Sequence, residues 1–505
     1  MKRLLIFVHR WLGIALCVLF LIWFPSGIGM MYWGFPDVSE QDQLTRSPAL
    51  DASKVRLSPA EAYARLGLAN PPSGVRLNSF DGRPVYRFDE GTVFADTGEE
   101  PTEVSTLMVR RIASSWTGQP SQDATVERLE DVDQWTVQQN LRDVGPLWKF
   151  AWPNGEHVYV SQATGEVVQY TTSASRIGAY LGPIPHWFYI TPLRKHGPEW
   201  SRVVIWSSGI GTFAAILGVV IGAWTYSPSK RYRRAGAPSA IPYRGQKRWH
   251  MVLGLVFGIA TVTWAFSGML SMDPFPMETG ANPLRRGVER PDIPQALRGE
   301  MQFVAFEARH PREALAQLAG LDVKQLEATT FAGEPIYLAT LADGTTRIVP
   351  MEGEAQAAFD RQRVVDVITR AGRAGSIETR LVEQYDRYYF DRNRQRPLPV
   401  ILAQLDDEEH TRYYIDPKTA RVVGGYSDRD WVSRWLYSGL HSFNFPWLYN
   451  YRPLWDIVVI AFMLGGTALS VTSLVLAWRV IGRKLRGVVP GAQPRGLSDD
   501  LALAE

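Results

Sequence analysis

Cysteine is nearly absent from this chain of 505 residues, which contains only Cys17. A single cysteine excludes a disulfide framework, a zinc site built on cysteines and an iron–sulfur cluster. Cys17 falls inside an uncharged stretch, where we expect it to pack as a small apolar residue. The folded parts of the chain therefore have to be stable through their own cores.

Acidic residues are missing from the segment 227–249, which carries seven lysines and arginines. Basic residues also gather at the N-terminus and after residue 478. Such patches can bind nucleic acid, but these ones flank hydrophobic stretches, and short basic segments beside membrane spans stay in the cytoplasm. We therefore expect no nucleic-acid partner and both termini in the cytoplasm.

Charge is missing altogether from four stretches, each long enough to cross the roughly 30 Å of hydrocarbon in a bilayer. They are Trp11–Trp33, Val203–Tyr226, Met251–Met272 and Ile457–Trp478. The first lacks a clear small-residue cleavage site, so we interpret it as a retained anchor and not as a signal peptide. The chain is thus predicted to be a multi-pass membrane protein in contact with lipid.

The basic segments set the predicted order of domains, with two large blocks outside the membrane. The order is a first transmembrane helix in 1–34, an outer block in 35–200, a second helix in 201–226, a cytoplasmic loop in 227–248, a third helix in 249–272, a second outer block in 273–453, a fourth helix in 454–482 and a cytoplasmic tail in 483–505. Each block has turns followed by short alternating strands, and helix-start signals such as Ser58-Pro-Ala-Glu61, which are typical of an α+β module.

Many residues recur at a fixed spacing, which indicates an internal repeat. Six residues of the first stretch recur 241 positions later: His9, Gly13, Trp23, Ser26, Gly27 and Met31. Seven residues around the second stretch recur 255 positions later: His186, Trp200, Val203, Val204, Ile205, Gly211 and Thr212. Because both halves run from inside to outside and back, the sequence predicts two parallel repeats related by a pseudo-twofold axis along the membrane normal.

Four of the eight histidines form two pairs that the repeat matches. His9 and His250 open the first and third stretches, and His186 and His441 precede the second and fourth. A lone histidine at a membrane edge is usually an interfacial residue, but matched titratable side chains at membrane depth indicate a function. The symmetry places His9 opposite His250 near the inner surface, and His186 opposite His441 near the outer surface.

Paired neutral imidazoles on facing helices can hold haem iron, so we predict that these four histidines are the ligands of two haems. Gly13 and Gly254 follow their histidines by four residues and share their helix face, where a missing side chain lets a porphyrin edge approach. Close packing of helices is the alternative role for both glycines. A non-haem metal site would need carboxylates beside the histidines, and we disfavour it because few lie nearby.

Other residues near the two surfaces have two explanations each. Six basic residues are candidates to pair with haem propionates or to reach lipid headgroups: Arg10, Lys247, Arg248, Arg194, Lys195 and Arg452. We assign structural roles to the remaining histidines, His157, His196, His310 and His410. Of these, His196 is kept as a reserve candidate for a haem ligand.

The sequence His-Arg-Trp-Leu-Gly at 9–13 and the sequence Arg-Trp-His-x-x-Leu-Gly at 248–254 resemble those of PepSY-associated transmembrane proteins. The resemblance covers about 1–485 and includes the segments around His186 and His441. This family includes bacterial inner-membrane ferric-siderophore reductases. The resemblance implies a four-span α+β membrane protein with two periplasmic PepSY-like modules, bound haem b, and a role as an oxidoreductase of iron uptake that passes electrons outward to a ferric-siderophore.

The electron donor is expected to be another molecule. No Gly-x-Gly-x-x-Gly follows a strand on the cytoplasmic side, so the chain holds no nicotinamide or flavin domain of its own there. A quinol or a separate reductase is the expected donor. The chelate is expected beside the outer histidines, where the candidate contacts are Trp187, Tyr189, Trp447 and Tyr449. An aromatic belt at the membrane interface explains the same residues.

Two other functions fit the sequence. The protein is either a siderophore-uptake accessory that binds without electron transfer, or a regulator of periplasmic proteolysis, because PepSY modules are associated with peptidase inhibition. No feature of the sequence identifies a particular siderophore.

Overall fold

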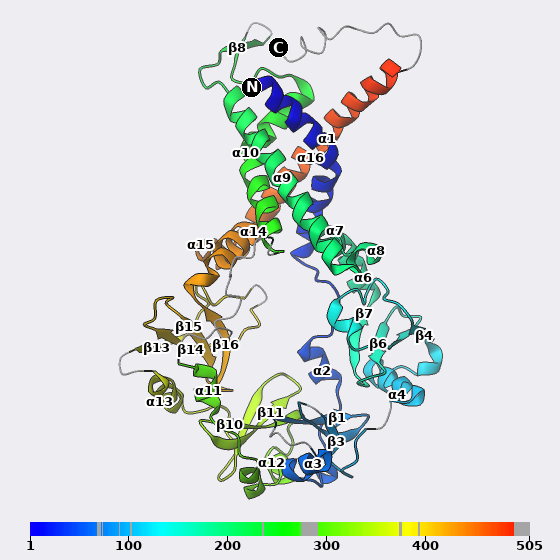
Figure 1. Ribbon diagram of the computed structural model, residues 1–505, viewed down its shortest axis with the longest axis vertical. Coiled ribbons are helices and arrows are strands. Elements are labelled where there is room, and N and C mark those ends of the chain that lie inside the picture. Colours follow the sequence, from blue (N-terminus) through cyan, green and yellow to red (C-terminus); the bar gives the residue numbers. More distant parts are fainter. Residues whose placement is uncertain are drawn as a thin grey trace.

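Four long helices form a bundle at one end of the computed structural model (Figure 1). They are α1 (Lys2–Met30), α9 (Gly197–Thr225), α10 (Gly245–Leu270) and α16 (Leu454–Val488). All four are long and apolar enough to cross a membrane. The structure describes residues 1–488 apart from 68–71, 73, 90, 102–103, 235–236, 273, 275–290, 373–375 and 392–393.

Close packing in the bundle depends on small residues. Helix α9 packs along α10, and α16 packs against both α1 and α10. A Cβ on Gly466 of α16 would lie 2.5 Å from the ring of Phe24, and one on Gly211 of α9 would lie 3.2 Å from Phe20. These glycines let the helices approach closely, as is usual where helices associate within lipid.

One antiparallel sheet contains strands from both halves of the chain. Its order is β12 (Thr346–Pro350), β11 (Glu334–Leu341), β10 (Val323–Phe331), β1 (Val75–Phe80), β2 (Arg83–Arg87) and β3 (Thr92–Phe94). The central strands β1 and β10 pair with Leu77 opposite Leu326. Helices α3 (Pro59–Leu66) and α12 (Pro311–Gln317) contribute to the same hydrophobic core, which contains side chains of both halves. Each outer block also has a cluster of its own buried side chains, so the shared core adds to the cores expected within the blocks.

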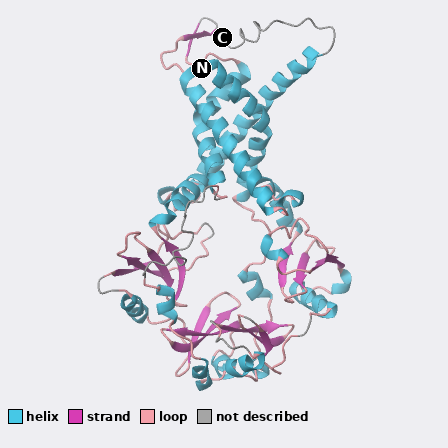
Figure 2. Cartoon of the chain, in the orientation of Figure 1, coloured by secondary structure: helices cyan, strands magenta, loops and turns pink. Residues whose placement is uncertain are grey.

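Two four-stranded antiparallel sheets lie between the six-stranded sheet and the bundle, one on each side (Figure 2). One contains β4 (Thr125–Leu129), β5 (Leu147–Ala151), β6 (His157–Ser161) and β7 (Val167–Thr171) and packs on α4 (Thr106–Thr117). The other contains β13 (Ile377–Val382), β14 (Val400–Leu405), β15 (Arg412–Asp416) and β16 (Arg421–Tyr426) and packs on α11 (Ile293–Arg298) and α13 (Arg361–Ala371). A small hairpin of β8 (Tyr232–Arg234) and β9 (Ala237–Ser239) lies at the opposite end of the bundle.

Short helices connect these sheets to the bundle. The first arm, which connects the β4–β7 sheet to α9, contains α6 (Ser173–Leu181), α7 (Pro183–Trp187) and α8 (Thr191–Arg194). The second arm, which connects the β13–β16 sheet to α16, contains the π-helical η6 (Val432–Gly439), α14 (Leu440–Ser442) and α15 (Pro446–Tyr449). The remaining elements are α2 (Glu40–Arg46), α5 (Gln139–Arg142), η1 (Ala52–Lys54), η2 (Ser121–Asp123), η4 (Phe303–Ala308) and η5 (Asp428–Asp430).

The predicted start of α3 is confirmed, and equivalent local contacts occur in both halves of the chain. Ser58 and Glu61 form the predicted capping box of α3, and His310 caps α12 by accepting a hydrogen bond from the backbone of Arg312. Tyr86 and Tyr337 occupy matching strand positions, and their hydroxyls donate to the carbonyls of Leu57 and Arg309, respectively.

The packing of Gly466 generates a prediction with a control in the same helix. Gly466→Ala should lower the free energy of unfolding in detergent by about 1–3 kcal/mol, because the added methyl group meets Phe24. Gly482→Ala should be neutral or stabilising by up to about 1 kcal/mol, because no atom lies within 4 Å of the new Cβ. Equal unfolding curves for the two variants would contradict this account of the bundle.

Candidate functional site: two histidine pairs

The inner pair lies in the bundle, where α1 contributes His9 and α10 contributes His250. Their ring centroids are 6.3 Å apart and the ring planes are inclined by 38°. Each ring is anchored by a neighbouring helix: Nδ1–H of His9 donates to the carbonyl of Ala214 on α9 at 3.0 Å. Nδ1 of His250 bonds Oγ1 of Thr472 on α16 at 3.1 Å. The predicted pairing across the bundle is therefore present in the structure.

The outer pair lies where the arms meet the bundle, with His186 on α7 and His441 on α14. Their ring centroids are 6.1 Å apart and the planes are inclined by 68°. Nδ1 of His186 bonds Oγ of Ser26 at 3.2 Å, and Nδ1 of His441 bonds Oγ of Ser267 at 3.0 Å. Ser26 and Ser267 are themselves 241 positions apart, so both halves make the same contact.

The hydrogen bonds define the same tautomer for all four rings. The hydroxyls of Ser26, Ser267 and Thr472 each donate to a backbone carbonyl of their own helix, which leaves their oxygens to accept from imidazole Nδ1–H. The carbonyl of Ala214 can only accept. In the neutral imidazole Nδ1 therefore carries the proton, and Nε2 presents a lone pair.

Burial keeps the outer imidazoles neutral. It lowers the pKa of His186 to about 3, with a further contribution from the nearby His441, and it lowers the pKa of His441 to about 4. The neutral form is the one that ligates a metal ion. A metal-ligating histidine usually donates its other N–H to a hydroxyl or carbonyl, as these do.

The spacing of each pair suits one metal ion between the rings. A metal–imidazole bond is about 2.0 Å long and the ring centre lies roughly 1.1 Å beyond the nitrogen, so two opposed imidazoles have centroids roughly 6 Å apart. The observed separations are 6.3 and 6.1 Å. Among the residues that the structure describes, no group of three or more His, Cys, Asp or Glu could hold a metal ion. Each pair would thus supply two imidazole ligands to a metal ion.

Glycines adjoin three of the four rings. A Cβ on Gly27 or Gly268 would lie 3.6 Å from Cε1 of His186 or His441, respectively, and one on Gly218 would lie 2.8 Å from Cε1 of His9. Gly13 and Gly254 face open space: the nearest atom to a Cβ on Gly254 is a Leu469 methyl carbon at 4.0 Å, and none lies within 4 Å of one on Gly13. This space is what the predicted role of these two glycines requires.

The two pairs lie near opposite ends of the bundle. Gly27 marks the outer pair on α1 and is eighteen residues from His9, which corresponds to about 27 Å at 1.5 Å per residue. Aromatic rings occupy the core between the pairs, where Phe24 contacts Trp264 at a centroid distance of 6.0 Å. The indole N–H groups of Trp23 and Trp264 are buried there and find no hydrogen-bond partner among the described residues.

A tryptophan holds the chain in place just after each outer histidine. Nε1–H of Trp200 donates to the carbonyl of Trp187 at 2.7 Å, and Nε1–H of Trp455 donates to that of Ser442 at 3.0 Å. These are equivalent positions, because both members are 255 residues apart. Each of these bonds holds the last residue of the short helix that carries the histidine.

The four aromatic candidates for substrate contact lie on opposite arms. Trp187 and Tyr189 contact each other near α7, and Tyr449 packs on Trp455 near α15. Trp187 is 36% exposed and Trp447 is 69% exposed, whereas Tyr449 is buried. Only Trp187 and Trp447 of the four are thus exposed enough to offer a ring to a large ligand.

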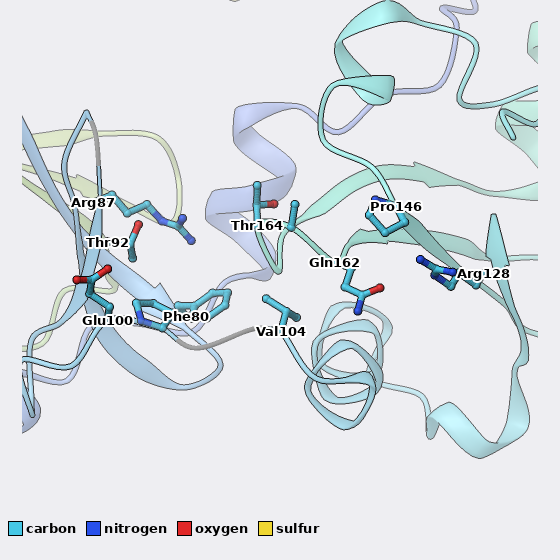
Figure 3. Close-up of a pocket in the computed structure, with 11 residues that line it drawn as sticks. Phe80, Arg87, Thr92, Glu100, Val104, Arg128, Pro146, Gln162 and Thr164 are labelled. Atoms are coloured by element: carbon cyan, nitrogen blue, oxygen red, sulfur yellow. The ribbon is translucent and has the colours of Figure 1, made fainter. Parts of the chain in front are cut away.

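A cavity of about 650 Å³ lies between β1–β3 and the β4–β7 sheet, away from the histidines. Figure 3 shows its two sides, with Phe80, Arg87, Thr92 and Glu100 facing Arg128, Pro146 and Gln162. Arg87 forms an ion pair with Glu166, and Arg128 forms one with Glu130, both at 3.0 Å. Because its arginines already have partners, the cavity is a less compelling site than the histidine pairs.

Sequence reasoning found the four histidines but missed the groups that hold them. The recurrence of Ser26 as Ser267 was visible, and it could have suggested a shared role. Thr472 and Gly218 had no such signal, because the first half places no threonine or serine at the position that matches Thr472. Of the other histidines, His157 lies in β6, His410 bonds Asp428, and His196 directly precedes α9.

The fold and the site define a class: a four-span membrane protein with α+β sheets beyond the bundle and two half-buried histidine pairs. The family model for the PepSY-associated TM region matches the chain twice, over residues 7–280 and 247–500, and the protein belongs to this family. A comparison with curated proteins finds no match to this chain.

The tryptophan bond generates a prediction. Trp455→Phe should lower the free energy of unfolding by about 1–3 kcal/mol, because it leaves a cavity and removes the donor to the Ser442 carbonyl. Trp478→Phe in the same helix should change it by less than about 0.5 kcal/mol, since Trp478 is 76% exposed. The measurement is unfolding in detergent, and an equal loss in both variants would refute the structural role of Trp455.

Proposed function

We propose that this protein is a haem-containing oxidoreductase of the bacterial inner membrane that passes electrons outward to a ferric-siderophore in the periplasm. The observation that carries the proposal is the pair of duplicated imidazole sites, each with Nδ1 hydrogen-bonded, Nε2 without a hydrogen bond to any described residue, and the rings roughly 6 Å apart. Haem b at each site would use His9 and His250, or His186 and His441, as its protein ligands.

The distribution of charge supports the proposed orientation. The end of the bundle with β8–β9 and the N-terminus carries the basic segments and would be cytoplasmic. The three larger sheets, at the other end, would be periplasmic and correspond to the PepSY-like modules. The matched contacts of Ser26 and Ser267 support parallel repeats around an axis along the membrane normal.

The chain's own residues would position the cofactors and exclude water. Hydrogen bonds orient each ring, aromatic side chains fill the core between the sites, and burial keeps the outer imidazoles neutral. Bound haem would supply one-electron chemistry, with potentials set by ligands and burial. A quinol or a separate reductase would be the donor, and Fe(III) in the chelate would gain one electron and be released as Fe(II), which hard oxygen donors hold less tightly.

A binding role without electron transfer is the second candidate function. The cavity in Figure 3 favours it, because it lies far from the histidines and has polar and aromatic lining residues. The protein would then be a siderophore-uptake accessory or a regulator of periplasmic proteolysis, and purified protein expressed with ample haem would be colourless.

Haem content tests the ligand assignment. Wild-type protein should contain about two haems by the pyridine haemochrome assay and show a dithionite-sensitive Soret shift. His250→Ala and His441→Ala should each remove about one haem, because each removes one of two axial ligands. His410→Ala is the control, since His410 lies in a turn and is 59% exposed. Unchanged haem content in both of the ligand variants would refute the assignment, and reduced protein that leaves a ferric hydroxamate unreduced would refute the reductase activity.

The serine contacts generate a second test. Ser267→Ala should weaken haem binding at the outer site by roughly 10–100-fold, because the hydroxyl that orients His441 is lost. Ser271→Ala, at the end of the same helix, removes a hydroxyl that donates to the carbonyl of Gly268 and should have no effect. Titration of apoprotein with hemin measures both, and identical affinities would show that Ser267 does not support the ligand.

A further inference from the structure

Arg434 is a buried arginine close to the outer histidine pair. It belongs to η6, and its side chain is only 6% exposed. Tyr437, three residues later, stacks on His441 with ring centroids 5.3 Å apart and planes inclined by 26°. π-Helical turns are rare and occur frequently at functional sites.

The guanidinium of Arg434 is held firmly but is not saturated. Nε donates to the carbonyl of Arg387 at 2.5 Å, and Nη2 donates to that of Asn444 at 2.8 Å. Phe390 and Trp435 lie against it, each with its ring centroid 4.3 Å from the guanidinium carbon. Nη1 is buried and has no hydrogen-bond partner among the described residues, and the same is true of Oδ1 of Asn444.

No ion pair among the described residues includes Arg434, and the Asp386 carboxylate acts on its charge without forming one. Burial lowers its pKa to about 10, so the guanidinium remains charged at neutral pH. A buried charge is costly unless an opposite charge accompanies it. The site therefore suits an anion.

The repeat shows that the fold itself does not need this cation. The position 255 residues before Arg434 holds Ala179, which is fully buried, and the position matching Tyr437 holds Gly182. The first arm thus reaches its histidine without either side chain. The difference places an extra positive charge on one side of the outer site only.

We propose that Arg434 binds a carboxylate beside the outer histidine pair through Nη1. An arginine suits this role because its planar fork forms charge-assisted hydrogen bonds with carboxylates. The carboxylate has two possible sources, a propionate of the outer haem or a carboxylate of a ligand that enters between the arms. The inference rests on the proposed function for the first source and is independent of it for the second.

The basic residues predicted from the sequence for the outer surface have other partners. Lys195 forms an ion pair with Asp131 at 3.2 Å, and Arg452 forms one with Asp456 at 2.5 Å. Arg194 lies over the rings of Tyr189 and Trp200, and its Nε has no hydrogen-bond partner among the described residues, but Arg194 is half-buried whereas Arg434 is buried. These contacts leave Arg434 as the better candidate for an anion.

The first experiment compares the affinities of hemin and of hemin dimethyl ester, which lacks free carboxylates, for wild type, Arg434→Gln and Arg434→Lys. If the propionate is the partner, esterification should weaken binding to wild type by roughly thirtyfold or more. The same ester should cost little in Arg434→Gln, because the two changes remove one interaction. Arg434→Gln should also lower the midpoint potential of the outer haem, since a positive charge is lost. Arg202→Gln is the control, because Arg202 is exposed and paired with Glu199.

The second experiment measures citrate binding to the same proteins by calorimetry, with and without hemin. Citrate binding to wild type that is lost in Arg434→Gln and kept in Arg202→Gln would assign the site to a ligand carboxylate. If neither the ester nor citrate distinguishes wild type from Arg434→Gln, the inference is refuted. If wild type binds no hemin, the proposed function fails, and the citrate experiment alone decides whether Arg434 binds a carboxylate. The ester comparison on wild type does not depend on the folding of any variant.

Discussion

The structure depends on one constraint: a polar ring buried among apolar side chains needs partners for its nitrogens. All four imidazoles meet half of this requirement in the same way, with Nδ1 bonded to a hydroxyl or carbonyl. The ring centroids of the two pairs lie 6.3 and 6.1 Å apart. Two pairs of histidine rings, one near each end of the bundle, are therefore fixed in orientation by the helices around them.

The sheets beyond the bundle serve the outer position. His186 and His441 do not belong to the long helices but to short helices at the ends of the two arms. Their approach to each other thus depends on how the arms are joined, and the six-stranded sheet joins them at the far end through the pairing of β1 with β10. Serines on α1 and α10 then hold each ring from the side of the bundle.

The sequence predicts the membrane spans, the antiparallel strands and the pairing of the histidines, because each has a local signal or an internal repeat. Hydrophobic length identified α1, α9, α10 and α16 as spans, and the repeat identified His9 with His250 and His186 with His441. The joining of both halves in one sheet was not predictable, because alternating strands do not indicate their neighbours. The same holds for Thr472 and Arg434, whose roles arise only when distant segments meet.

The register of β1 with β10 has a consequence for how this architecture can arise. Val75 faces Ala328 and Leu77 faces Leu326, so the pairing is symmetric about Arg76 and Glu327, which are equivalent residues 251 positions apart. If two identical chains paired in this register, a twofold axis would pass through this position. The residue there would face its own copy, so an arginine would face an arginine. Fusion of the two units into one polypeptide removes that restriction, so opposite charges can occupy the axis and each arm can acquire side chains that the other lacks.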